Sequence, residues 1–305
     1  MEKCVLTKRL AIFAHYDKDN VIDDYVLYYL KCLKEVSEKI IFSSDCILND
    51  SEKAKLEGLC DYVIGEKHNE YDFGSWKRGF EFANTKENID FDELIFANDS
   101  CYGPFFPLGQ IFDEMENRKC DFWGITENKY GIKKPQRHIQ SYFMVFKKEV
   151  FQSSEFINFM HSIRQMQNKN NVIENYEIGL SQILFKNGFI GESYVEKYRS
   201  VGNSTIYKWR ELIAENLSQF LKCSLLKLQN TTKTTVQGWT KTIDTSAYDI
   251  KLIENNLKRF NIRPVEEKSP LAVKRMFFNS ILFIPKILRE PIVCLVQKLL
   301  PFIFD

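Results

Sequence analysis

The chain has 305 residues, of which 44% are apolar and 14% aromatic, so it can bury a sizeable core and a disordered polypeptide is excluded. Lys and Arg total 42 against 41 Asp and Glu, which removes the electrostatic basis for a nucleic-acid-binding protein. The eight cysteines form no CxxC pair, and the first ten residues contain no long apolar run. We therefore expect no structural zinc, no secretory signal and a reducing, cytoplasmic location.

Strands and helices alternate from the first residues onward. Residues 9–14 (RLAIFA) form a short apolar run that predicts a buried strand, and residues 20–36 carry apolar side chains at helical spacing. Three more strands are predicted at residues 39–45, 60–66 and 94–97. This alternation is typical of βαβ units and predicts an α/β fold with a mainly parallel sheet.

The middle of the chain continues the same pattern. A helix is predicted over residues 108–117, a strand over 121–126, and a further strand that turns into a helix over 141–151. Residues 174–189 predict a helix that Gly188 ends, and residues 205–228 are rich in helical patterns. Together with the first strands, these elements predict one domain over residues 1–230.

Two segments of different composition follow that domain. Residues 231–270 are expected to be a polar linker, and residues 271–305 a helical C-terminal appendage. Pro and basic residues interrupt the apolar residues of the appendage, so no stretch reaches the roughly 20 apolar residues of a spanning helix. A broken, basic, amphipathic tail favours peripheral attachment to a membrane surface, and the alternative is that its helices pack on the domain.

Polar residues follow several predicted strands directly: His15 and Asp17, Asp45, and the pair Asn98 and Asp99. Ligands of open α/β sheets bind beyond the carboxyl ends of the strands, so we expect these side chains to share one site. No glycine-rich phosphate loop follows the first strand, which disfavours a standard dinucleotide or P-loop site. Asp99 beside Asn98 could ligate Mg²⁺ or Mn²⁺ through oxygen, and the alternative is an ordinary turn.

Three further groups of residues could carry chemistry. Residues 71–79 mix aromatic rings, an acid, two cations and two glycines, which suits a nucleotide, unless the aromatic rings lie in the core. Glu177, placed in the first turn of its predicted helix, could act as a general base, with Glu174 as its rival. His138 could contact metal, phosphate or acceptor, and Trp123 could stack on a sugar, although both residue types are often structural.

Six blocks in chain order carry a family resemblance: YDFGSWKRGF, LIFANDSCYGPFFPL, DFWGIT, HIQSYFMVFKKEVF, YEIGLSQILFKNGF and STIYKWRELI. They resemble the rhamnan-synthesis F family of bacterial glycosyltransferases, which make O-antigen, rhamnan and related surface polysaccharides. The similarity runs from about residue 9 to residue 226. It implies a GT-A-like, Rossmann-type nucleotide-diphospho-sugar transferase domain at the cytoplasmic face of the inner membrane.

The resemblance also implies partners and roles. The donor is a nucleotide-diphospho-sugar, dTDP-L-rhamnose being a frequent example, and the acceptor is a lipid-linked saccharide. Residues 97–99 occupy the place of the metal-binding DxD element but lack its first acid, so Asp99 alone remains as the metal ligand, and Glu177 is the expected base of an inverting transfer. The donor-binding residues implied are His15, Asp17, Asp45, Asp72, Gly74, Trp76, Lys77, Arg78 and Asn98, and the acceptor-binding residues are Trp123, His138, Gln140 and Tyr142.

Two other functions fit the same residues. A membrane-associated assembly protein that kept the fold and lost turnover would explain the degenerate DxD element. A metal-dependent phosphohydrolase would direct the same acids at water. The sugar and the linkage are not determined by the sequence, because specificity rests on a few contacts in the pocket.

Overall fold

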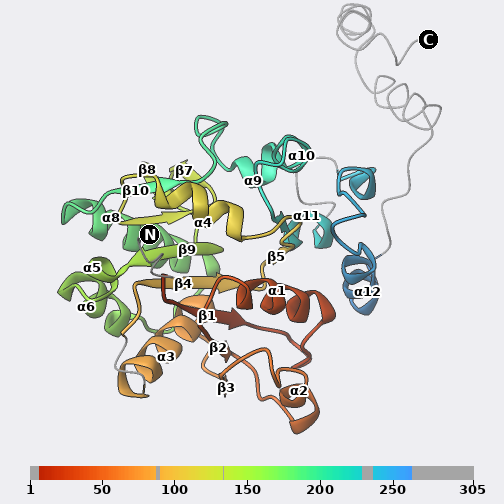
Figure 1. Cartoon of the computed structure of the whole chain (residues 1–305), viewed down its shortest axis with the longest axis horizontal. Helices are drawn as coiled ribbons and strands as arrows, with labels where there is room; N and C mark the ends of the chain where they lie inside the picture. Colours follow the sequence, from red (N-terminus) through yellow and green to blue (C-terminus); the bar gives the residue numbers. More distant parts are fainter. Residues whose placement is uncertain (1–6, 87–89, 133, 229–235, 263–305) are drawn as a thin grey trace, which may run out of the picture. The chain divides into compact units, whose positions relative to one another are not determined.

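The computed structural model describes residues 7–86, 90–132, 134–228 and 236–262 (Figure 1). All of them belong to one compact unit, Met1–Arg263. The predicted appendage, residues 271–305, lies outside the described residues. Within the described ranges, none of the helices combines the length and the apolar character that crossing a bilayer requires.

A seven-stranded sheet in the order β10-β6-β9-β4-β1-β2-β3 forms the centre of this unit. Its strands are β1 (Arg9–His15), β2 (Lys39–Ser44), β3 (Tyr62–Gly65), β4 (Glu93–Asn98), β6 (Phe122–Gly124), β9 (Phe143–Lys147) and β10 (Gly191–Ser193). Strands β1 to β4 are parallel, and β9 runs antiparallel to both of its neighbours. The expected α/β class with a mainly parallel sheet is therefore confirmed.

Two small ribbons flank the large sheet. One pairs β5 (Cys101–Tyr102) with β11 (Leu221–Lys222), and the other pairs β7 (Glu127–Tyr130) with β8 (Pro135–Ile139). The first ribbon joins residues about 120 positions apart, because Cys101 pairs with Lys222. It thereby brings the segment after residue 220 to the carboxyl end of β4.

The helices follow the predicted order, with additional helices that the sequence analysis did not predict, such as α2 and α6, and with two predicted segments that differ. They are α1 (Asp24–Lys34), α2 (Asp50–Ala54), α3 (Tyr71–Lys86), α4 (Gly109–Glu116), α5 (Lys148–Phe151), α6 (Ser154–Ser162), α7 (Lys169–Val172), the π-helix η1 (Ile173–Ile178), α8 (Gly179–Lys186), α9 (Ser204–Tyr207), α10 (Trp209–Ala214), α11 (Cys223–Lys227), the 3-10 helix η2 (Trp239–Lys241) and α12 (Lys251–Arg259). The helix expected from residue 174 starts earlier, at α7, and passes through a π-helical stretch. The segment expected as a polar linker contains η2 and α12 in its described part, and the buried Ile253 and Leu257 anchor α12.

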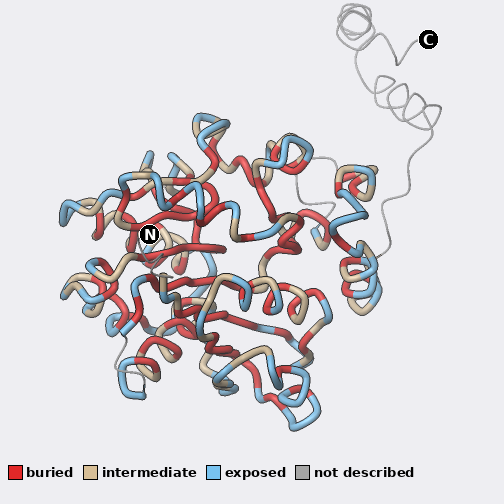
Figure 2. Tube along the Cα trace, in the orientation of Figure 1, coloured by how far each residue is buried: buried red, intermediate tan, exposed pale blue. Residues whose placement is uncertain are grey.

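Helices cover both faces of the sheet. On one face, Leu10 and Ile12 of β1 pack with Trp76 and Phe80 of α3 and with residues of α6 and α8 in one apolar cluster. On the other face, Phe13 of β1 meets Tyr29 of α1 edge to face, with ring centroids 5.2 Å apart. Strands buried on both faces read as continuous apolar runs, and Figure 2 shows them buried along their length.

The carboxyl ends of the parallel strands meet at one edge of the sheet. His15 at the end of β1 pairs with Ser44 of β2, and Ala14 pairs with Asn98 of β4. Because β9 is antiparallel, its first residue, Phe143, pairs with Ala97 at this same edge. The residues that follow β1 and β4 and those that precede β9 are therefore neighbours.

Close packing of α3 on β1 depends on Gly79. A Cβ atom added at Gly79 would lie 2.4 Å from Cγ2 of the fully buried Ile12. We expect Gly79→Ala to lower the free energy of unfolding by about 1–3 kcal/mol through overpacking, measured by urea denaturation. Gly109→Ala is the matched control, because nothing lies within 4 Å of a Cβ atom there, and it should be nearly neutral. Equal stability of the two variants would contradict this account.

Candidate functional site

The parallel pairing of β1 and β4 places Asp99 against the end of β1. The Asp99 Oδ2 atom accepts a hydrogen bond of 2.9 Å from the Tyr16 backbone N–H and lies 3.9 Å from Nε2 of His15. His15 Nδ1 is in turn 2.8 Å from Oγ of Ser44 on β2. Three strand ends thus contribute to one polar cluster, as the positions of these residues in the sequence predicted.

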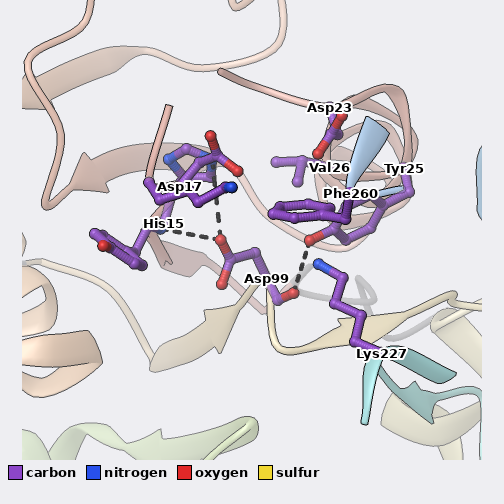
Figure 3. Close-up of a pocket in the computed structure, with 10 residues that line it drawn as sticks. His15, Asp17, Asp23, Tyr25, Val26, Asp99, Lys227 and Phe260 are labelled. Atoms are coloured by element: carbon purple, nitrogen blue, oxygen red, sulfur yellow. Dashed lines mark hydrogen bonds and ion pairs between the residues drawn. The ribbon is translucent and has the colours of Figure 1, made fainter. Parts of the chain in front are cut away.

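A cavity of about 270 Å³ lies beside this cluster (Figure 3). Its lining combines acids, bases and aromatic rings, with Asp99 facing it from the sheet edge and Lys227 entering from α11. The lining residues are His15, Tyr16, Asp17, Lys18, Asp23, Tyr25, Val26, Asp99, Lys227 and Phe260. We call it the Asp99 cavity.

Burial shifts the pKa values of Asp99 and His15, two residues that line the Asp99 cavity. Burial, reinforced by the nearby Asp72, raises the pKa of Asp99 to about 8. Burial also lowers the pKa of His15 to about 4, although neighbouring acids oppose this shift. At pH 7 Asp99 is therefore mostly protonated and His15 is mostly neutral.

The rim of the Asp99 cavity is held by Arg259, the last residue of α12. Its guanidinium donates to Asp17, to Asp19 Oδ2 at 3.2 Å and to Asp23 Oδ2 at 2.6 Å. Burial alone would raise the pKa of Asp17, but the hydrogen bonds from Arg259 and from the backbone outweigh it and lower that pKa. Arg259 thus fastens α12 to the loop between β1 and α1, and its single positive charge offsets part of the negative charge of the three acids. Phe260, the next residue, becomes a wall of the cavity.

A second cavity, of about 400 Å³, holds Glu177 and His138. It is lined by Asn128, Tyr130, Gly131, Ile132, His138, Gln140, Ile173, Glu177, Ile178, Val201, Gly202, Asn203 and Tyr207. We call it the Glu177 cavity. Three acceptor-side or catalytic residues expected from the sequence, His138, Gln140 and Glu177, are brought together here.

Hydrogen-bond donors, and not the dipole at the start of a helix, stabilise the ionised side chain of Glu177. Its Oε2 atom accepts from the backbone N–H of Ser141 at 3.0 Å and from the Ser141 hydroxyl, and its Oε1 atom lies 3.5 Å from Nε2 of His138. Burial opposes ionisation, but these contacts outweigh it and lower the pKa of Glu177 to about 2, while the pKa of His138 is raised. The expectation that Glu177 lies in a first helical turn is wrong, because it occupies the π-helix η1, and π-helical stretches are frequent at functional sites.

Asp99 and Glu177 line different cavities, and Asp72 at the start of α3 links them. Asp72 accepts a hydrogen bond of 2.9 Å from the Asn98 side chain. Its pKa is raised, chiefly by burial and further by the charge of Glu177, while Lys169 and Lys222 oppose the shift. The two acids therefore do not share one pocket, and Asp72 lies within electrostatic reach of both.

Several residues expected at the site serve other roles. Trp76 is fully buried, stacks on Phe96 and donates to the Ala97 carbonyl at 3.0 Å. Trp123 is buried against Phe112 and Phe143 on the sheet face, so it is no exposed platform for a sugar. Both indoles lie in the core because the apolar burial of a large ring outweighs its single polar atom.

The expected diphosphate contacts Lys77 and Arg78 line neither cavity. Lys77 donates to the Ile163 carbonyl at 3.2 Å, and Arg78 pairs with Glu66 and with Glu70, the latter at 2.7 Å. Lys77 is therefore held at the segment after α6, and Arg78 at the loop between β3 and α3. The structure does not place either of them in these cavities, where the sequence had led us to expect them.

Gly74, Asp45 and Tyr142 shape the surroundings of the site. A Cβ atom at Gly74 would lie 2.3 Å from Glu70 Cβ, so glycine lets the preceding loop approach α3. Asp45 Oδ1 accepts from the backbone N–H groups of His68, at 2.7 Å, and Asn69, which orders that same loop. Tyr142 is buried, with its hydroxyl 2.9 Å from Oγ1 of Thr126.

The residues around Asp99 fit a divalent cation poorly. Asn98 Oδ1 accepts from both the N–H and the hydroxyl of Ser100, and its amide nitrogen donates to Asp72, so the side chain has no oxygen left for a metal. Across the described residues, no group of three or more His, Cys, Asp or Glu side chains has the geometry to hold a metal ion.

Sequence reasoning missed Arg259, Phe260, Lys222, Lys227 and Ser141. Arg259, Phe260, Lys222 and Lys227 neither follow a strand of the large sheet nor belong to one of the six blocks, whereas Ser141 lies in the block HIQSYFMVFKKEVF. The first four reach the site only through the β5–β11 ribbon and the docking of α12. Ser141 had the only usable signal, since it directly follows the predicted site residue Gln140.

A mainly parallel open sheet with polar cavities at the carboxyl edge defines an α/β ligand-binding domain. The chain belongs to the family "Rhamnan synthesis protein F" (RgpF), whose sequence model matches residues 40–279. The family resemblance of the six sequence blocks is thereby confirmed.

Two curated relatives are similar over more than half of the chain. "Virulence protein VirA" of Vibrio anguillarum is 32% identical over 178 residues, which are 57% of this chain and 55% of that protein. "Uncharacterized protein y4gN" of Sinorhizobium fredii is 27% identical over 180 residues, 59% of this chain and 46% of that protein. The chain therefore spans about half the length of the curated relatives it matches.

Similar solved structures include three transferases. A cytidylyltransferase from Leptospira borgpetersenii has a TM-score of 0.41 at 12% identity, covering 86% of this chain and 99% of that one. Core-mannan synthase A from Aspergillus fumigatus, in a Mn/GDP form, has a TM-score of 0.40 at 10% identity, covering 59% and 70%. Glucosyl-3-phosphoglycerate synthase from Mycobacterium tuberculosis, with Mn²⁺ and UDP, has a TM-score of 0.39 at 9% identity, covering 61% and 70%.

The opposite pKa shifts of Asp99 and Asp17 predict opposite effects of amide substitution. The unfolded chain releases the Asp99 proton near pH 4, whereas the folded protein keeps it until about pH 8, so this group lowers stability as pH rises across that window. We expect Asp99→Asn to be stabilising by about 1–3 kcal/mol at pH 8 and nearly neutral at pH 4. Thermal unfolding at both pH values measures this difference.

Asp17→Asn is the matched control. The pKa of Asp17 is lowered, so its contribution to stability is present above the unfolded pKa and is lost only on acidification. We expect Asp17→Asn to destabilise the protein by about 1–3 kcal/mol at pH 8, because the hydrogen bonds from Arg259 lose their charged acceptor. Destabilisation by both substitutions at pH 8 would contradict the described charge states.

Proposed function

We propose that this protein is a glycosyltransferase that moves a sugar from a nucleotide-diphospho-sugar to a lipid-linked or growing surface polysaccharide. The observation that carries the proposal is a pair of polar cavities, one holding Asp99 and the other Glu177, with Asp72 within electrostatic reach of both acids. A two-substrate transfer needs separate pockets whose contents meet at a shared boundary. Membership of the rhamnan synthesis family supports a saccharide product, with L-rhamnose as one candidate sugar.

The Asp99 cavity suits the nucleoside end of the donor. Tyr16 and Phe260 offer aromatic faces to a base, and Asp99 and Asp17 offer hydrogen-bonding groups to a ribose or a base edge. A volume of about 270 Å³ is small for a complete nucleotide-sugar. The diphosphate and sugar would therefore extend along the sheet edge towards Asp72 and the Glu177 cavity.

The Glu177 cavity suits the acceptor. Its carboxylate is ionised, so it can accept a proton, and the exposed Tyr130 and Tyr207 at its rim can stack on a sugar ring. The acceptor oxygen would attack the anomeric carbon while the bond to the nucleotide diphosphate breaks, which inverts the configuration. A carboxylate with a pKa of about 2 is a weak base, so the proton would pass to Glu177 late, once the attacking oxygen has become acidic.

A non-catalytic, membrane-associated assembly protein is the second candidate. The specific observation in its favour is Asn98, which stands in place of an acid and whose carboxamide is fully engaged by Ser100 and Asp72. The membrane partner rests on residues outside the described ranges and stays a prediction. A transferase would bind the donor and transfer its sugar, whereas the assembly protein would show no turnover.

Donor binding can be tested by thermal unfolding against a panel of nucleotide-diphospho-sugars, each with Mn²⁺ and with EDTA. A true donor at 100 times its dissociation constant should stabilise the protein by about 2.7 kcal/mol through mass action. We expect one nucleotide-sugar class to raise the melting temperature while the corresponding free sugars do not. Stabilisation by no member of the panel would contradict the proposed function.

The role of Glu177 can be tested against Glu174, its neighbour in η1. We expect Glu177→Gln to lower the transfer rate by at least about 100-fold with little change in donor affinity, because the proton acceptor is lost. Glu174→Gln should retain most of the rate, since Glu174 lines neither cavity. Melting temperatures of both variants control for the lost pair with His138. The reverse ranking of rates would transfer the role of base to Glu174.

A further inference from the structure

Lys222 is a cation that the proposed mechanism has not used; it lines neither cavity, but it contacts residues next to Asp99 and next to the residue that holds Glu177. The β5–β11 ribbon places it there, because Lys222 pairs with Cys101 and the next residue, Cys223, donates its N–H to the Ser100 carbonyl at 2.9 Å. Its ammonium donates to the Ser100 hydroxyl at 3.3 Å and lies 4.2 Å from the centre of the Tyr142 ring. Ser100 follows Asp99, and Tyr142 follows the residue that holds Glu177.

A second lysine, Lys227, stands one helical turn further on, at the end of α11. It lines the Asp99 cavity, with its ammonium 4.3 Å from the centre of the Phe260 ring (Figure 3). Both lysine side chains are partly exposed. A ligand that runs from the Asp99 cavity to the Glu177 cavity would therefore pass Lys227 first and Lys222 second.

The charges around these lysines favour an anion. Arg259 pairs with Asp17, Asp19 and Asp23 and offsets part of their negative charge, and the side chain of Asn98 is uncharged. Lys222 lies near Asp72 and Lys227 near Asp99, so these two lysines supply positive charge to this stretch of the sheet edge. Partly buried cations are suited to binding phosphate groups.

We propose that Lys222, assisted by Lys227, binds the diphosphate of the donor and neutralises the leaving group in place of a divalent cation. This inference rests on the proposed glycosyltransferase function. When the bond from the anomeric carbon to the diphosphate oxygen breaks, its electron pair stays on that oxygen and adds negative charge there. The lysine ammonium groups stabilise this charge by hydrogen bonds, and the acceptor proton goes to Glu177. The poor fit of Asn98 and Asp99 to a metal is consistent with this division of roles.

The test is calorimetric titration with UDP, GDP, CDP and dTDP, and with the corresponding nucleosides, in EDTA and in Mn²⁺. We expect the wild-type protein to bind one nucleoside diphosphate in EDTA with an affinity that Mn²⁺ changes less than about 3-fold. Lys222→Met keeps the aliphatic stem over Tyr142 and should weaken that diphosphate by at least about 10-fold, a loss of about 1.4 kcal/mol, while nucleoside affinity stays unchanged. Lys222→Arg should recover part of the loss.

Lys31→Met is the matched control, since Lys31 is exposed on α1 away from both cavities, and it should bind like the wild type. Equal diphosphate affinity in wild type and Lys222→Met, or wild-type binding that requires Mn²⁺, would overturn the lysine proposal and leave the glycosyltransferase proposal standing. Binding of no nucleoside diphosphate under either condition would overturn both.

Discussion

The parallel pairing of β1 with β4 is the constraint on which the site depends. Its register sets Ala14 opposite Asn98, so the next residues of the two strands, His15 and Asp99, emerge side by side. A shift of one residue would turn Asp99 to the other face of the sheet, because side chains alternate along a strand. The apolar residues of both strands resist such a shift, since they are buried on both faces. Core packing therefore fixes the position of the polar site.

Burial desolvates both Asp99 and Glu177, but because their hydrogen-bond partners differ, their pKa values shift in opposite directions. Asp99 meets one backbone donor and a distant imidazole, so desolvation dominates and it keeps its proton to about pH 8. Glu177 meets two donors of Ser141 and the imidazole of His138, and these outweigh desolvation, so it remains ionised. The same residue class thus supplies a neutral hydrogen-bonding group in one cavity and a fixed negative charge in the other.

The sequence predicts the parts of this structure that local patterns encode. Apolar runs identified β1, β2 and β4, and the polar residues after them identified the carboxyl edge. Trp76 and Trp123 were expected at the binding site but lie in the core. A Trp that lines a binding site and a Trp that packs in a core cannot be distinguished from the local sequence alone. Lys77 and Arg78 were misplaced because the helix phase of α3 was unknown, and Glu177 because α7 extends its helix backwards. Arg259 was beyond prediction, since its partner Asp17 lies 242 positions away.

The hydrogen bonds of Arg259 join the two ends of the described unit at the Asp99 cavity, since Arg259 and its partner Asp17 are 242 positions apart. The walls of this cavity come from residues near the start of the unit and from Phe260 near its end, whereas β1 and β2 pair across fewer than 40 residues. Contacts of such long sequence separation carry the largest loop-closure cost and form late in folding. A chain whose sheet has assembled while α12 is still undocked would have nearly all of its secondary structure and an open, unwalled cavity. The Asp99 cavity is thus completed only when α12 docks.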